Sequence, residues 1–388
     1  MGIKKFIAAV SVLLTVAGCG SASPAAPSAG TEVPSRGHAH GGPPPSAAPL
    51  RNGERFQEVG LERPYRPAPP EGGTDEYRCF LIDPKLTEAG YLTGSQFLPQ
   101  NTEIVHHGIF YQIAASDVDD AKKVDAQTEG DGWQCFGGSG LDDDRASYIG
   151  AWAPGHAETL IGDRTGYRIE AGSQIVLQVH YNLLATDGTP GPTDQSSMRL
   201  RLAPATAVVT PLLGLQLPSP IELPCTPDES GPLCDREAAI ADLVKRTGAG
   251  AREEVDGLNE LCNQGRPPVA GNTQHCDHDI PQSVLLYAIT PHMHLLGRSF
   301  SVELNPGTPS ARTLLNQPVY NFDDQSEQVL PRPVRINEGD TIRVTCTHDA
   351  TLRSTLPQLQ TLQPRYVVWG DGTSDEMCLA ILTVTTKI

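Results

Sequence analysis

Short runs in which apolar and polar residues alternate recur along most of the chain, with turn residues between them. Examples are IVHHGIFYQI, QIVLQVHYN, DTIRVTCTH and MCLAILTVTT, and the turn sequences include EAGS and NEGD. Alternation with a period of two is typical of β-strands, and many short strands joined by Gly- and Pro-containing turns are typical of β-sandwiches. We therefore predict an all-β protein with two sandwich domains, over residues 76–208 and 209–388.

The alternating pattern is interrupted between about residues 222 and 281. Apolar residues at helical spacing form two groups there: Ile240, Leu243 and Val244, and then Val255, Leu258 and Leu261. Asp235 stands where it would cap the first of the two helices. Because four cysteines lie in the same segment, we predict a small helical insertion stapled by disulfides, acting as structural padding rather than as a lid or partner surface.

The N-terminus reads as an export signal. Lys4 and Lys5 precede an apolar run that is too short to span a membrane, and the sequence VAGC that follows resembles a lipobox. We predict a bacterial lipoprotein signal over residues 1–19, with Cys19 lipidated; an ordinary secretory signal with an incidental cysteine is the alternative. The protein is then exported and anchored by lipid to the cell envelope, with the outer membrane as the expected location, facing the periplasm or the surface.

Residues 20–75 are rich in Ser, Ala, Pro and Gly, so we expect a disordered tether. His38 and His40 within it would bind copper weakly, although an inert histidine pair is more common. The chain of 388 residues suits two domains and this tether. Its formal net charge of −17 argues against a nucleic-acid partner, which needs a basic surface. Eight cysteines besides Cys19 predict up to four disulfides in an exported chain, with the pairing left open by spacing alone.

Candidate metal ligands follow one another in a fixed order. They are His106, His107, His180, His292, His294 and Met377. Histidine is the commonest copper and zinc ligand, and a thioether beside two imidazoles favours Cu(I) over zinc. The order suggests two mononuclear copper sites, one with three histidines and one with two histidines and a methionine. A zinc site is a further reading, which the methionine makes the least favoured.

The spacing of these residues supports the second site better than the first. His292 and His294 share a strand face, whereas the adjacent His106 and His107 point to opposite faces unless the strand ends, bends or bulges there. From the residues alone, satisfied core or surface histidines and a core methionine are as good an explanation. The other histidines of the folded region are weaker candidates: His156, His275, His278 and His348.

The motifs VHHGIFYQI, VLQVHYN, ITPHMHLLGRSF, EGDTIRVTCTHD and SDEMCLAIL, in this order, resemble landmarks of the copper type II, ascorbate-dependent monooxygenases, the family of dopamine β-hydroxylase and peptidylglycine α-hydroxylating monooxygenase. The resemblance implies two antiparallel, jelly-roll-like sandwiches whose coppers face each other across a solvent-filled cleft. It assigns electron transfer to the copper of His106, His107 and His180. It assigns dioxygen binding and activation, next to the substrate, to the copper of His292, His294 and Met377.

The resemblance also implies disulfides. It pairs Cys346 with Cys378, which would hold the strand so that Met377 points at the metal, and it favours a bond between Cys79 and Cys135. The four cysteines of the insertion would then pair among themselves in an order that stays open: Cys225, Cys234, Cys262 and Cys276.

The chain departs from the peptide-hydroxylating branch at the substrate positions. Thr290 stands in place of an arginine that binds the substrate carboxylate, and Leu379 and Ile381 replace an asparagine and a tyrosine. Without these groups the carboxylate of a glycine-extended peptide would be unpaired, and an apolar wall is expected instead. The motif HLLGRSF is closer to the dopamine-hydroxylating branch, but this does not imply a catecholamine substrate.

The sequence therefore predicts a copper-dependent monooxygenase with two copper ions per chain. It would hydroxylate a C–H bond of a small organic substrate with O2 and an external one-electron reductant, ascorbate or another. The alternative is a non-catalytic copper-binding lipoprotein of the envelope that serves as a carrier, a buffer or an interaction module. The sequence leaves the substrate and the oligomeric state open.

Overall fold

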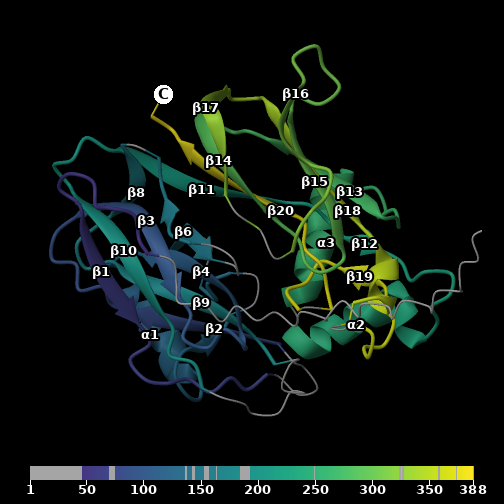
Figure 1. Ribbon diagram of the computed structural model, residues 1–388. Coiled ribbons are helices and arrows are strands. Elements are labelled where there is room, and N and C mark those ends of the chain that lie inside the picture. Colours follow the sequence, from purple (N-terminus) through teal and green to yellow (C-terminus); the bar gives the residue numbers. More distant parts are fainter. Residues whose placement is uncertain are drawn as a thin grey trace, which may run out of the picture. The chain divides into compact units, whose positions relative to one another are not determined.

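The computed structural model in Figure 1 describes the greater part of the chain from residue 46 onward. The described residues are 46–69, 75–135, 138–141, 145–152, 157–162, 164–183, 193–248, 250–322, 325, 327–356, 359–372 and 374–387. The predicted signal peptide, Cys19, His38 and His40 lie outside them. No helix within these described ranges is long and apolar enough to cross a membrane.

Strands dominate the structure, which confirms the all-β prediction. One sheet of nine strands has the order β1-β10-β3-β8-β11-β20-β14-β17, with β7 paired to β3. The pairs along it are antiparallel except β8 with β11. Their bounds are β1 Arg55–Gly60, β3 Gly90–Leu98, β7 Thr159–Leu160, β8 Thr165–Ile169, β10 Ser197–Pro204, β11 Thr210–Pro218, β14 Val284–His292, β17 Gln328–Ile336 and β20 Leu379–Thr385.

A second sheet completes the first sandwich by packing against β1, β10, β3 and β8. Its order is β5-β2-β9-β4-β6, and the core between the two sheets contains Phe97, Phe110 and Leu177. The helix α1 (Val118–Gln127) lies against its outer side, beside Trp133 and the disulfide Cys79–Cys135. The strand bounds are β2 Asp75–Ile82, β4 Val105–Ile113, β5 Trp133–Gln134, β6 Ala146–Trp152 and β9 Gln174–Asn182.

The second sandwich combines β11, β20, β14 and β17 with a four-stranded sheet of order β13-β18-β15-β16. Its core joins Ile289 and Leu382 from one sheet to Phe300 and Val344 from the other. Since β11 pairs with β8 on one side and β20 on the other, the nine-stranded sheet runs through both sandwiches. The remaining strands are β12 Glu222–Leu223, β13 Thr273–Asp279, β15 Gly297–Leu304, β16 Arg312–Gln317, β18 Thr341–His348 and β19 Val367–Val368.

The insertion contains the two predicted helices, α2 (Arg236–Thr247) and α3 (Gly250–Asn263). The Asp235 side chain accepts a hydrogen bond from the backbone N–H of Ala238 at 2.9 Å, so it caps α2 as expected. Val255 and Leu258 of the predicted helical group are buried, whereas Leu261 is 60% exposed near the end of α3. The insertion cysteines pair as Cys225–Cys234 and Cys262–Cys276. Two short 3₁₀ helices complete the list of elements. The first, η2 (Pro232–Cys234), precedes α2 within the insertion, and the second, η3 (Ala350–Ser354), follows β18.

Residues 46–69 correct the prediction of a disordered tether over 20–75. Strand β1 pairs along its whole length with β10. The guanidinium of Arg201 on β10 is fully buried and binds the carboxylates of Glu54 at 2.8 Å and Glu158 at 2.9 Å. A buried charge needs such partners, so this segment is an integral part of the first sandwich.

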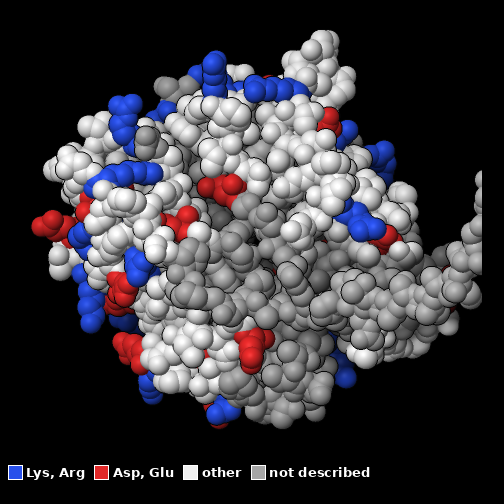
Figure 2. Space-filling view, viewed as in Figure 1, with Lys and Arg blue, Asp and Glu red and all other residues white. Residues whose placement is uncertain are grey.

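Charged side chains are scattered over the face seen in Figure 2. Lys and Arg lie mainly toward its edges and are mixed with Asp and Glu.

Candidate metal centre

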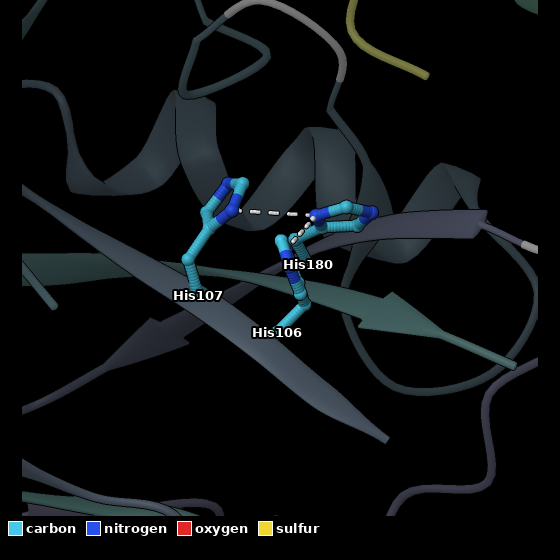
Figure 3. A group of neighbouring side chains, drawn as sticks. All are labelled: His106, His107 and His180. Carbon is cyan, nitrogen blue, oxygen red and sulfur yellow. Dashed lines mark hydrogen bonds between the residues drawn. The ribbon is translucent and has the colours of Figure 1, made fainter. Parts of the chain in front are cut away.

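A bulge in β4 brings the three predicted histidines of the first sandwich together. In the pairing of β4 with β9, Val105 lies opposite Tyr181 and His107 opposite His180, so His106 is an extra residue in the ladder. The bulge cancels the alternation of faces, and both adjacent imidazoles turn toward His180 (Figure 3). The Nδ1 atom of His180 lies 3.2 Å from that of His106 and 3.3 Å from that of His107.

The outer nitrogen of His180 is bound to Asp75. Its Nε2 donates to Asp75 Oδ1 at 2.9 Å, and Asn182 donates to the same oxygen at 2.8 Å. The Tyr77 ring stacks on the imidazole with centroids 4.1 Å apart. A proton held on Nε2 leaves the Nδ1 lone pair facing the other two histidines, as a metal ligand requires.

Burial favours the neutral form of His107 and His180. Desolvation lowers the pKa of His107, and the neighbouring His180 and His106 lower it further. Desolvation also lowers the pKa of His180, against the opposing effect of Asp75. Metal ions bind the neutral imidazole, so no proton has to leave at neutral pH. Ligand atoms of the three residues lie within 4.8 Å of one another, and the donor set fits a copper ion.

The second predicted set lies at the end of β14. The rings of His292 and His294 are 5.2 Å apart between centroids. His292 Nδ1 donates to Gln325 Oε1 at 2.5 Å, and His294 Nδ1 to the Asp375 carbonyl at 3.3 Å. Met377 is buried and lines the same cavity as both histidines. Burial lowers the pKa of His292 to about 3, with His294 adding to the effect.

The surroundings of His294 Nε2 indicate whether a metal ion fits this set. This atom is buried and has no hydrogen-bond partner among the described residues. A buried polar nitrogen without a partner carries a desolvation cost that a bound metal ion would remove. Two imidazoles and a thioether form a soft donor set, so the residues present fit copper.

A buried carboxylate next to Met377 holds this region together. Glu376 Oε2 accepts from the backbone N–H of His294 at 2.9 Å, and Oε1 from that of Leu296 at 2.6 Å. Burial opposes the ionisation of Glu376, but His348, 3.3 Å away, holds its pKa below the usual value. The disulfide Cys346–Cys378 ties the residue after Met377 to β18, as the resemblance implies.

One cavity of about 110 Å³ is lined by residues of both sets. His107, His292, His294 and Met377 border it. The His107 and His292 rings lie 6.1 Å apart between centroids, so the solvent-filled cleft implied by the resemblance is replaced here by a shared cavity. The other described lining residues include Tyr111, Tyr148, Trp152, Tyr167, Thr290, Glu327, Leu379 and Ile381.

Three of the weaker candidates lie among the described residues, and none of these three joins either set. His348 contacts Glu376 and the Met377 carbonyl, His278 contacts the Pro218 carbonyl, and His275 is exposed on β13. His156 lies outside the described residues.

Sequence reasoning missed the groups that orient the ligands, namely Asp75, Gln325, Asp375 and Glu376. Asp375 and Glu376 stand directly before Met377, which could have drawn attention to them, whereas no local signal marks the other two.

Residues 269–384 match the family described as copper type II ascorbate-dependent monooxygenase, C-terminal domain. The resemblance drawn from the motifs is thereby confirmed for this segment. No curated protein sequence matches the chain.

Solved structures are only remotely similar. An allantoicase has a TM-score of 0.20 at 12% identity, over 76% of this chain and 86% of that one. Vicilin from tomato has a TM-score of 0.15 at 9% identity, over 81% of this chain and 75% of that one. At such scores these likenesses establish neither a shared fold nor a shared function.

Proposed function

Because residues 269–384 match the C-terminal domain of the copper type II ascorbate-dependent monooxygenases, we propose that this protein is a copper-dependent enzyme. It would insert one atom of O2 into a C–H bond of a small organic substrate. Two copper ions per chain and an external one-electron donor, ascorbate or another reductant, belong to this proposal. The observation that carries it is that one cavity is lined by His107 of the first ligand set and by His292, His294 and the soft ligand Met377 of the second.

The bound copper ions would supply one-electron transfer and the activation of dioxygen, and the protein supplies the surroundings. Asp75 and Gln325 fix the rings of His180 and His292 through their outer nitrogens. Glu376 holds the backbone of His294 beside Met377. Since most of the cavity wall is apolar or aromatic, it binds the carbon skeleton of a substrate and excludes bulk water, which protects a reactive site from side reactions.

Copper stoichiometry is the first test. The purified protein should bind two copper ions per chain, and His180→Ala and His292→Ala should each remove one. His275→Ala changes an exposed histidine outside both sets, so it is the matched control and should retain both ions. Electron paramagnetic resonance of the oxidised protein should show Cu(II); zinc in place of copper would contradict the proposal.

Oxygen consumption separates the enzyme from a copper carrier or buffer. The copper-loaded protein should consume O2 only with a reductant and should form a hydroxylated product. Met377→Ala should abolish this reaction while the first site keeps its copper. Two bound coppers without reductant-dependent O2 uptake across a broad panel of substrates would favour the non-catalytic alternative.

We also propose that Cys19 is lipidated and anchors the protein to the bacterial envelope. Its support is the lipobox-like sequence before this cysteine. Cys19→Ala should release the protein from the membrane fraction without changing its copper content; an unchanged membrane fraction would refute the anchor.

A further inference from the structure

The cavity has a direction, which the register of two strands defines. His292 on β14 lies opposite Leu379 on β20, and Ala288 lies opposite Thr383. Leu379, Ile381 and Thr383 alternate along β20 and therefore share one face, and the first two line the cavity. Thr383 is four positions after Leu379, which is roughly 13 Å along a strand. One end of the cavity is thus at the metal ligands, and the other is at the level of Thr383.

Glu327 closes this far end. Its carboxyl group lines the cavity, and Thr383 Oγ1 donates to Glu327 Oε1 at 2.6 Å. Burial raises the pKa of Glu327. Tyr148 and Tyr167 line the cavity too; burial raises the pKa of each hydroxyl, and the nearby Glu327 contributes to both shifts. A carboxyl and two phenols are therefore concentrated at one end of an otherwise largely apolar space.

The position of Tyr167 and Thr383 follows from the continuous sheet. Strand β11 pairs with β8 at Leu212 and Tyr167, and with β20 at Gly214 and Thr383. Three hydrogen-bonded strands therefore position Tyr167 and Thr383, while Glu327 directly precedes β17 and is held by its hydrogen bond to Thr383.

The charges around the cavity determine which polar group of a bound molecule could lie at this end. Glu327 and Asp371 are acidic, and the described lining residues include no Lys or Arg. A carboxylate or phosphate head would lack a cationic partner and would face Glu327, so its desolvation would be uncompensated. A group that donates a hydrogen bond meets an acceptor instead.

We infer that Glu327 binds the head group of an elongated apolar substrate whose length is on the order of 10 Å. The head group donates a hydrogen bond and is a hydroxyl or a protonated amine. Leu379 and Ile381 pack along the body of the substrate, and its opposite end lies beside His292, His294 and Met377. The identity of the reacting end rests on the proposed monooxygenase function, whereas recognition of the head group by Glu327 does not.

A binding experiment without turnover tests the head group. The probes are 1-octanol, 1-octylamine and octanoate, which share a chain length and differ in the head. Binding to the copper-loaded protein is measured without O2 or reductant, by calorimetry and by the fluorescence of Trp152, which lines the cavity. At least one donor probe should bind about tenfold more tightly than octanoate, the equivalent of one hydrogen bond. Preference for the alcohol or for the amine identifies the charge of the head.

Variants of Glu327 complete the test. Glu327→Leu should remove the preference over octanoate, and Glu327→Gln should retain the alcohol better than the amine because it keeps a neutral acceptor. Glu338→Gln, at an exposed glutamate, is the control and should change nothing. The inference fails if neither donor probe binds, if octanoate binds as tightly, or if Glu327→Leu leaves the preference intact.

Turnover distinguishes this inference from the proposed function. With O2 and reductant, the bound donor probe should be hydroxylated near its methyl end and not next to the head. Head-group discrimination without any product would refute the monooxygenase but keep the Glu327 site. Product hydroxylated beside the head group would refute the orientation of the substrate.

Discussion

Glu376 should be the residue whose loss most damages the second ligand set without removing a proposed ligand. It is fully buried, and its two oxygens accept the backbone N–H groups of His294 and Leu296 at 2.9 and 2.6 Å. Glu376→Ala leaves both donors buried without an acceptor and removes one of the two contacts of His348, which keeps the Met377 carbonyl. Hydrogen bonds to charged groups contribute about 1.5–3 kcal/mol each. Since water will enter part of the space left by the side chain, we expect a loss of roughly 3–5 kcal/mol in the free energy of unfolding.

Two measurements check this expectation. Urea unfolding of the metal-free protein gives the loss of stability, which should be about half as large for Glu376→Gln because one carbonyl oxygen remains to accept a hydrogen bond. Copper titration should show weaker binding at the set of His292, His294 and Met377, while the set in the first sandwich keeps its affinity.

Glu338→Ala provides the matched control, since its side chain is exposed and it should change stability by less than about 0.5 kcal/mol. The reasoning is refuted if Glu376→Ala lowers the free energy of unfolding by less than about 1 kcal/mol and binds both coppers as the wild type does.

Three further predictions concern the first sandwich and the cavity. Asp75→Ala should weaken copper binding at the set of His180 by about 10–100-fold in a competition titration, because the imidazole loses the group that orients it. Arg201→Ala should cost about 3–5 kcal/mol in urea unfolding, because the buried carboxylates of Glu54 and Glu158 lose their main cationic partner. Arg199→Ala, on the same strand at a partly exposed ion pair, should cost under about 1 kcal/mol; equal costs would contradict the place of residues 46–69 in the first sandwich. Glu327 has a raised pKa in the folded state, so its contribution to stability is present below its unfolded-state pKa of 4.5 and is lost as the pH rises through the folded-state pKa. Relative to Glu327→Gln, the wild type should therefore lose up to about 1.4 kcal/mol per pH unit between pH 4.5 and the folded-state pKa, with no further loss above it, and parallel stability curves would contradict the raised pKa.

The sequence predicted strands and helices well wherever the periodicity of apolar and polar residues was evident within one short segment. The strands that carry His180, His292 and Cys346 lie in the predicted runs, and Asp235 caps the helix for which it was proposed. Strand β1 was missed because a short run, RFQEVG, lies in a Pro- and Gly-rich region where composition argued for disorder. Its stability depends on pairing with β10 nearly 150 residues away, which no local pattern reveals.

The sequence indicated the proposed ligands, which the structure brings close together, but it did not indicate the residues that orient them. Adjacent His106 and His107 become neighbours on one side only through a bulge in β4, and a bulge depends on the register with β9 rather than on the two residues themselves. The same holds for Gln325, whose contact with His292 depends on the path of the chain between β16 and β17. The resemblance supplied what spacing alone did not.

The two candidate sites differ in which imidazole nitrogen faces the metal position: Nδ1 in His180 of the first site, and Nε2 in His292 and His294 of the second. His180 donates through Nε2 to Asp75 and turns Nδ1 toward His106. His292 and His294 donate through Nδ1 to Gln325 and to the Asp375 carbonyl, which leaves Nε2 for a ligand role. Each tautomer is fixed by a hydrogen bond formed by the protein itself, so the ligand sets are organised before a metal binds and folding does not have to accompany binding. Copper should then raise the free energy of unfolding by an amount set by its affinity and its concentration. The circular dichroism spectrum should show no change in secondary structure when copper is added. A large gain of strand signal on adding copper would show that the ligand sets form only with the metal.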